Sequence, residues 1–135
     1  MKGVLVDTCI WSLALRRQTL ENASVSIELT ALIHSEQARI MGPIRQEILS
    51  GYSNFEQYDK LRNKLTYFPN EEIKDIDFIC AAEFSNLCRK KGIQGSHIDY
   101  LICAVAHRTN MKIYTHDKDF IFYAKHLPIE LHLKS

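Results

Sequence analysis

Four acidic residues stand at positions where an alternating α/β chain usually carries its chemistry. Asp7 ends the apolar segment VLV, and Asp117 follows the segment IYT. Asp99 falls in the first turn of a helix that we expect over 96–110, and Glu47 lies on a short helix that follows MGP. Oxygen ligands suit Mg²⁺ and Mn²⁺. The four side chains therefore predict a divalent-cation site if the fold brings them together.

Several carboxylates in one cleft repel one another unless some bind protons or a cation neutralises them. A cation held in this way supports phosphoryl chemistry, because it withdraws charge from the phosphate and stabilises the leaving oxygen. Each acid also has an ordinary structural interpretation. Asp7 and Asp117 are suitable helix caps, Ser96 with Asp99 fits a capping box, and Glu47 fits a solvated helix face. Taken one at a time, the residues leave both interpretations open.

Short apolar segments alternate with amphipathic segments along the chain. The apolar segments predict strands at 3–6, 38–42, 66–68, 112–115 and 129–133. The amphipathic segments predict helices near 11–17, 24–36, 43–49, 55–65, 70–92, 96–110 and 118–127. This order is typical of an α/β fold with a parallel central sheet of about four to five strands and helices on both faces. We expect one domain over residues 1–135.

Ligands in such sheets bind beyond the carboxyl ends of the strands. Asp7 and Asp117 therefore open onto one crevice if the strands that precede them are neighbours. Asp99 heads a helical stripe whose next members are Ile102, Cys103 and Ala106. Residues three, four and seven positions apart share a helix face, so Asp99 is expected to face the sheet.

Composition narrows the class of protein. The chain has 135 residues, 46% hydrophobic and 24% charged, with a net charge of +1. It shows no apolar run long enough to span a bilayer and no signal-peptide pattern, so we expect a cytoplasmic protein without a membrane partner. The four cysteines form no C-x-x-C pair and fit small core side chains. A polyanionic partner needs a local patch or a metal ion, because the global charge is small.

Four segments together carry a resemblance to a known family. They are VLVDTCIW, GPIRQEILSG, HIDYLICAVA and IYTHDKDF, in this order. With this order and spacing, the sequence resembles PIN-domain ribonucleases, specifically the VapC-type toxins of toxin–antitoxin pairs. The resemblance extends over essentially the whole chain and implies a PIN-like domain.

The resemblance also implies a site and a reaction. It assigns metal binding to Asp7, Glu47, Asp99 and Asp117, with Asp119 close to the metal and with Thr8 and Thr115 as hydroxyl residues lining the site. The implied cofactor is Mg²⁺ or Mn²⁺, and the implied reaction is endonucleolytic hydrolysis of structured RNA, such as tRNA or rRNA, that inhibits translation. The products carry 5′-phosphate and 3′-hydroxyl ends. The implied partners are a second copy in a homodimer and a cognate antitoxin whose tail blocks the acidic cleft.

Basic and aromatic residues near the same end of the predicted sheet have two interpretations each. Arg16, Arg17 and Arg45 are placed to bind RNA phosphates beside the scissile bond, or they are solvated helix ends. Trp11 is placed to stack on an unpaired base, although packing in the core or at a dimer contact is the favoured interpretation.

A phospho-receiver-like, non-catalytic signalling domain is an alternative function of a different class. Such domains also place acids and Mg²⁺ at strand ends in an α/β sheet. They usually need paired acids at the first strand, whereas VLVDTC has one. A phosphatase that uses Asp7 as a nucleophile is a third alternative, but its usual second acid two positions on is absent, because position 9 is Cys. A PIN-like binding module without turnover is a further alternative.

Overall fold

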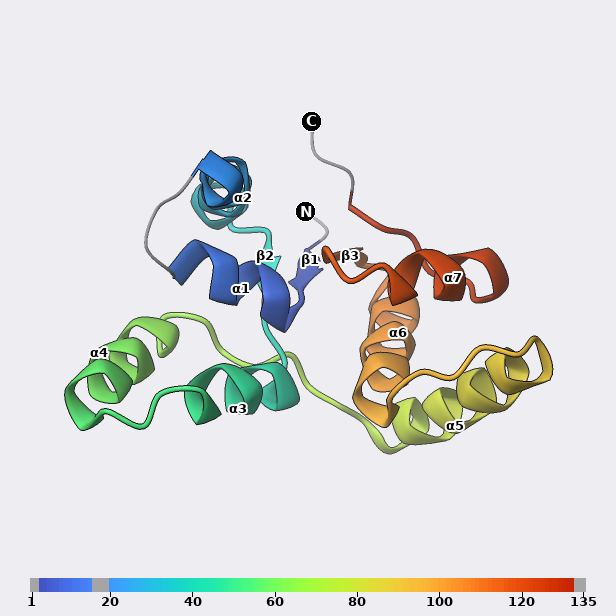
Figure 1. Ribbon diagram of the computed structural model, residues 1–135. Coiled ribbons are helices and arrows are strands. Elements are labelled where there is room, and N and C mark those ends of the chain that lie inside the picture. Colours follow the sequence, from blue (N-terminus) through green and yellow to red (C-terminus); the bar gives the residue numbers. More distant parts are fainter. Residues whose placement is uncertain (1–2, 16–19, 133–135) are drawn as a thin grey trace.

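A parallel sheet forms the centre of the molecule (Figure 1). The structure is a computed structural model that describes residues 3–15 and 20–132. Its strands are β1 (Val4–Val6), β2 (Ala38–Arg39) and β3 (Lys112–Tyr114), in the order β2-β1-β3. All three residues of β1 are buried, because helices cover both of its sides. The predicted fold class, a parallel α/β sheet, is confirmed.

Single parallel bridges extend the sheet at both edges. Ile40 pairs with Asn70 beyond β2, and Ile113 pairs with Leu131 beyond β3. The described residues thus contain three strands and two further one-residue pairings, where four to five strands were expected. The strand predicted at 66–68 is wrong, because this segment forms a turn and the pairing begins only at Asn70.

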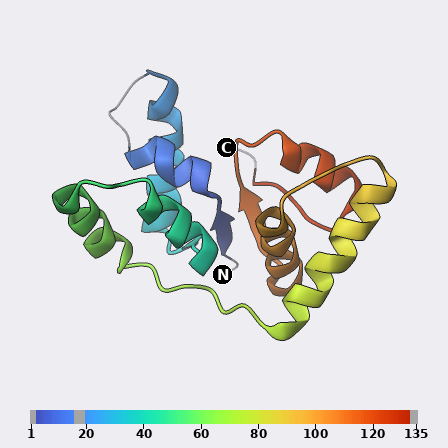
Figure 2. The same ribbon diagram turned by 60° about the horizontal axis from the view of Figure 1, so that its bottom comes forward.

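Helices flank the sheet on its two sides (Figures 1 and 2). Within the described residues they are α1 (Thr8–Leu15), α2 (Leu20–His34), α3 (Gly42–Ser50), α4 (Phe55–Leu65), α5 (Asp75–Lys90), α6 (His97–Thr109) and α7 (Asp119–His126). Figure 2 shows an extended segment that joins α4 to α5 across the molecule. None of the described helices combines the length and the apolar character that crossing a membrane requires.

Three helix starts differ from the sequence prediction, and the first is that of α1, which begins at Thr8 rather than near residue 11. The longest helix was expected from residue 70 but begins at Asp75, because Asn70 instead pairs with Ile40 at the edge of the sheet. Helix α2 also begins earlier than expected, at Leu20 rather than near residue 24. The helices predicted to end near residues 49 and 110 do so, with Gly51 and Asn110 as their C-caps, and Asn110 has the left-handed φ of 57° common at this position.

Trp11 belongs to the core. Its side chain is 3% exposed, its indole N–H donates to the Val6 carbonyl at 3.0 Å, and its ring packs edge-on against Phe68. The packing interpretation of this residue therefore holds, because a ring enclosed in this way offers no face to a nucleobase.

One buried ion pair joins α5 to α6. Asp77 is 1% exposed and binds Arg108 through both carboxylate oxygens, at 2.8 and 2.9 Å. Burial raises the pKa of Asp77, but the hydrogen bonds and charge of Arg108 and the Lys74 N–H outweigh it and leave the pKa lowered. A carboxyl whose pKa is lowered by folding stabilises the native state above its unfolded pKa, and that stabilisation is lost as the pH falls through the folded pKa.

We predict that Arg108→Met lowers the free energy of unfolding by on the order of 3 kcal/mol at neutral pH, because it leaves Asp77 buried without a counter-charge. Urea unfolding followed by circular dichroism measures this change. The matched control is Arg62→Met, whose ion pair with Asp59 is largely open to solvent, with side chains 55% and 38% exposed, and its cost is expected to stay below about 1 kcal/mol. Equal losses for the two variants would contradict the assignment.

Candidate metal centre

The register of β1 against β3 places Asp7 next to the segment that follows β3. Val6 is paired with Tyr114, so the residues that follow each strand, Asp7 and Thr115, lie next to each other. The Asp7 N–H donates to the Tyr114 carbonyl at 2.9 Å, which extends the pairing by one step. The Thr115 hydroxyl then donates to Asp7 Oδ2 at 2.9 Å, and the Thr8 N–H donates to Oδ1 at 2.8 Å. Both oxygens of Asp7 are therefore fixed by hydrogen bonds.

Asp117 and Asp119 are placed by a short series of local hydrogen bonds. The Asp117 N–H donates to the Thr115 hydroxyl, and the Asp119 N–H donates to Asp117 Oδ1, both at 3.0 Å. Asp119 begins α7, and both acids are exposed. The turn after β3 therefore presents two carboxylates beside Asp7.

Asp99 reaches the same place from α6. The Ser96 hydroxyl accepts a hydrogen bond from the Asp99 N–H at 3.0 Å, so the predicted cap forms. The three predicted stripe residues, Ile102, Cys103 and Ala106, are all buried, which turns this face of the helix inward. The Asp99 backbone therefore caps the helix while its side chain faces the other acids, and the two interpretations of this residue are compatible.

Glu47 approaches from the opposite side, on α3. Its neighbours Ile44 and Ile48 are buried and anchor the helix, whereas Glu47 itself is exposed and lines the cavity that Asp7 and Asp99 line.

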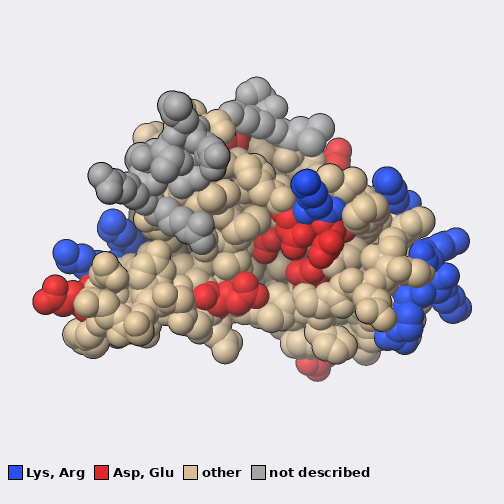
Figure 3. All heavy atoms as spheres, viewed as in Figure 1, with Lys and Arg blue, Asp and Glu red and all other residues tan. Residues whose placement is uncertain are grey.

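These side chains share a cavity of about 410 Å³, named here the acidic cavity. It is lined by Asp7, Thr8, Cys9, Ser12, Leu13, Glu47, Ile98, Asp99 and Asp117. Figure 3 shows acidic side chains gathered in a hollow at the centre of this face. Asp119 adjoins the cavity, since Asp99, Asp117 and Asp119 each offer an oxygen within 4.8 Å of the others.

Burial and like charge act together on two of the acids. The pKa of Asp7 is raised by burial and by the charges of Asp99 and Asp117, against the opposing hydrogen bonds from Thr115 and Thr8. The pKa of Asp99 is likewise raised by burial and by Asp117 and Asp119, against its own hydrogen bonds. Charging these carboxyls inside the cavity therefore costs free energy in the absence of a cation.

The donor set fits a hard divalent cation. Five carboxylates lie in or beside the cavity, and among the described residues Asp99, Asp117 and Asp119 have oxygens within 4.8 Å of one another. None of the ion pairs between described residues involves any of the five. Oxygen atoms in this arrangement are the ligands that Mg²⁺ and Mn²⁺ prefer. Cys9 adds a sulfur at the rim, 3.8 Å from Asp7 Oδ2. Burial raises the pKa of this thiol, which keeps it neutral and a poor ligand beside the carboxylates.

Of the residues predicted to bind substrate, the two threonines lie at the acidic cavity and Arg45 makes other contacts. Thr8 lines the acidic cavity, and Thr115 holds Asp7 and Asp117. The Arg45 guanidinium instead binds the Leu65 and Phe68 carbonyls and the Asn70 side chain, which ties α3 to the segment after α4. Arg16 and Arg17 lie outside the described residues.

Sequence reasoning missed part of the lining and one partner. Cys9, Ser12, Leu13 and Ile98 line the cavity without having been assigned to it. For the first three, a helix that begins directly after Asp7 is a usable signal, because its first turns border that acid. No local signal indicates that Tyr123 binds Asp99, since the two residues meet only through the packing of α7 on α6.

The sequence matches the PIN domain family over residues 4–125. The chain therefore belongs to this family, and the resemblance seen in its segments is confirmed. This membership does not support the phospho-receiver alternative. A comparison of the sequence with curated proteins finds no match.

Several solved structures have a similar fold, and one of them is a toxin–antitoxin complex from Klebsiella pneumoniae, 22% identical, with 87% of this chain and 90% of that chain covered and a TM-score of 0.64. FitAcB from Neisseria gonorrhoeae is 20% identical, with 97% of both chains covered and a TM-score of 0.79. VapBC2 from Rickettsia felis, bound to a promoter DNA fragment, is 18% identical, with 96% of both chains covered and a TM-score of 0.73. DNA-bound VapBC from Salmonella typhimurium is 13% identical, with 98% of both chains covered and a TM-score of 0.74. At these identities the likeness shows the fold.

We predict that Asp7→Asn raises the free energy of unfolding of the metal-free protein by about 1 kcal/mol at pH 8, because it removes a buried charge that faces Asp99 and Asp117. A carboxyl whose pKa is raised by folding stabilises the native state fully below its unfolded pKa and loses that effect as the pH rises through the folded pKa. The gain should therefore shrink at pH 4. Thermal melts in EDTA measure it, and a destabilised variant at pH 8 would contradict the electrostatic account.

Proposed function

We propose that this protein is a metal-dependent endoribonuclease and the toxin of a VapBC-type toxin–antitoxin pair. One observation carries the proposal: Asp7, Glu47, Asp99 and Asp117 line one cavity in a chain of the PIN domain family. The acids come from four separate elements, and bringing the buried Asp7 and half-buried Asp99 close to further carboxylates is costly unless a cation is bound.

In this proposal Asp7, Glu47, Asp99 and Asp117 hold the cation, and Asp119, which has an oxygen within 4.8 Å of Asp99 and Asp117, is close to it. The bound Mg²⁺ or Mn²⁺ supplies charge stabilisation to the phosphate and its leaving oxygen. Thr115 holds Asp7 and the turn that carries Asp117 in place. Thr8 also lines the cavity, and in this proposal its hydroxyl donates a hydrogen bond to an RNA phosphate oxygen.

The acidic cavity is open to solvent on one face, as Figure 3 shows. It therefore admits a phosphodiester backbone between α3, which carries Glu47, and the turn before α7, which carries Asp117. We propose structured RNA such as tRNA or rRNA as the substrate class. Arg16, which lies outside the described residues, remains a proposed phosphate contact, whereas Arg45 is engaged by protein carbonyls and has no proposed RNA contact.

We predict that the purified protein cleaves RNA when Mg²⁺ or Mn²⁺ is present, and that Asp99→Asn abolishes cleavage while the fold is retained. Loss of one ligand should exceed the roughly 10–100-fold cost typical of residues that act behind the ligands. Gel analysis of RNA fragments with end mapping measures the rate and the 5′-phosphate product, and circular dichroism checks the fold.

The control for this prediction is Asp75→Asn, the same chemical change in the first turn of α5 at an exposed carboxylate. It should leave cleavage unchanged. Expression of the wild type and of Asp75→Asn should slow growth of the host, whereas Asp99→Asn should not. Cleavage by Asp99→Asn at the wild-type rate would rule out the proposed site.

The proposed partners are a second copy of the chain and a small antitoxin protein that blocks the acidic cavity. The basis is family membership together with the toxin–antitoxin complex among the structural neighbours. We predict that the tagged protein purifies from its native host with a small protein bound, and that RNA cleavage rises by at least about tenfold when this protein is removed. Full activity of the intact complex would contradict the inhibitory role.

A further inference from the structure

A buried tyrosine, Tyr123, forms a hydrogen bond with Asp99. The hydroxyl of Tyr123, on α7, donates a hydrogen bond to Asp99 Oδ2 at 2.7 Å. The Tyr123 side chain is 0% exposed, so this bond is formed beneath the acidic cavity and not within it. Tyr123 is not among the residues that line the cavity. It contacts the cation site only through Asp99.

The position of this hydroxyl is fixed by tight packing. The Tyr123 ring packs against Tyr100 and Phe120, with centroid distances of 5.2 and 5.0 Å. Gly95 completes the enclosure, because a Cβ at this residue would clash with the Tyr123 hydroxyl oxygen. A glycine is therefore required for the hydroxyl to reach Asp99. Burial also raises the pKa of Tyr123, so the hydroxyl remains a hydrogen-bond donor.

The Asp99 carboxylate needs a hydrogen-bond partner because neighbouring carboxylates repel it. Its carboxylate faces Asp117 and Asp119, each with an oxygen within 4.8 Å of an Asp99 oxygen. Without a restraint, repulsion favours rotation of the side chain out of the cavity. We propose that Tyr123 is a positioning residue that holds the Asp99 carboxylate in the orientation that binds a divalent cation. The inference rests on the proposed cation site.

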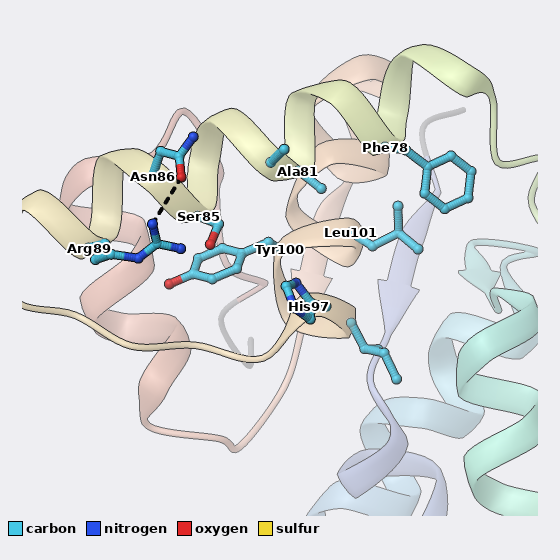
Figure 4. Close-up of a pocket in the computed structure, with 10 residues that line it drawn as sticks. Phe78, Ala81, Ser85, Asn86, Arg89, His97, Tyr100 and Leu101 are labelled. Carbon is cyan, nitrogen blue, oxygen red and sulfur yellow. Dashed lines mark hydrogen bonds between the residues drawn. The ribbon is translucent and has the colours of Figure 1, made fainter.

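Tyr100 provides a matched control from the same aromatic cluster. Its hydroxyl is buried, and the hydrogen bonds of the described residues connect it to no carboxylate of the acidic cavity. It lies at a separate pocket of about 470 Å³ between α5 and α6, where Figure 4 shows it near Ser85 and Arg89. Tyr100→Phe therefore removes a hydroxyl of equal size and burial without touching Asp99.

The experiment compares Mn²⁺ binding by the full-length wild type, Tyr123→Phe and Tyr100→Phe, using isothermal titration calorimetry. Tyr123→Phe should weaken Mn²⁺ binding by roughly tenfold, the lower end of the range for residues that orient metal ligands. Tyr100→Phe should bind as the wild type does. Thermal melts in EDTA should show both variants folded. Equal Mn²⁺ affinity for Tyr123→Phe and the wild type would overturn the inference.

A double-mutant cycle separates positioning from a general structural role. If Tyr123 acts through Asp99, then Tyr123→Phe should not weaken Mn²⁺ binding further in an Asp99→Asn background. A tenfold loss that persists in that background would assign the effect to the fold and contradict the inference. Gly95→Ala, which crowds the hydroxyl without removing a polar group, should weaken binding in the same direction.

The outcome for the wild type distinguishes the two proposals. Absence of Mn²⁺ binding by the wild type would reject the cation site and the inference together. Wild-type binding with an unchanged Tyr123→Phe affinity would reject only the positioning role. RNA cleavage measured at saturating Mn²⁺ gives a further check, because a residue that orients a ligand should affect the Mn²⁺ concentration needed more than the maximal rate.

Discussion

Two carboxylates of this fold are held out of water beside other carboxylates, and this costs free energy whenever they are charged. Asp7 and Asp99 are half-buried or buried, close to other acids, and the pKa of each is raised as a result. A fold that maintains this arrangement gives up stability in the absence of a cation. The hydrogen bonds that surround the acids are what offset this loss. They come from Thr8 and Thr115 for Asp7, and from Tyr123 for Asp99.

The central sheet makes the convergence possible. Parallel strands end at the same edge, and the register of β1 against β3 places Asp7 beside Thr115. Helix α6 then directs Asp99 to this edge because the rest of its face is buried. The strands and α6 thus form for reasons unrelated to the site, and the site results because they present their acids at the same edge of the sheet. The ion pair between Asp77 and Arg108 shows the alternative solution, in which a buried carboxylate has its own fixed counter-charge.

The sequence predicts the features that depend on local pattern. The α/β order, the ends of helices at Gly51 and Asn110, and the inward face of α6 all follow from spacing and capping residues. Features set by tertiary contacts are not predicted. Asn70 pairs with the sheet edge instead of capping a helix, and Arg45 binds carbonyls from a distant segment instead of facing solvent.

The candidate site likewise contains residues that the sequence predicts and one that only the tertiary structure reveals. The five acids are visible in the sequence because each follows a strand or stands in a helix turn. Tyr123 is 24 positions from Asp99, and only the packing of α7 reveals it.

The Mn²⁺-binding role of the acids stays a prediction. It is tested most directly by anomalous diffraction from crystals soaked in Mn²⁺. The account predicts a manganese peak within the acidic cavity, in contact with Asp7, Glu47, Asp99 and Asp117; a cavity without manganese at saturating concentration would contradict it.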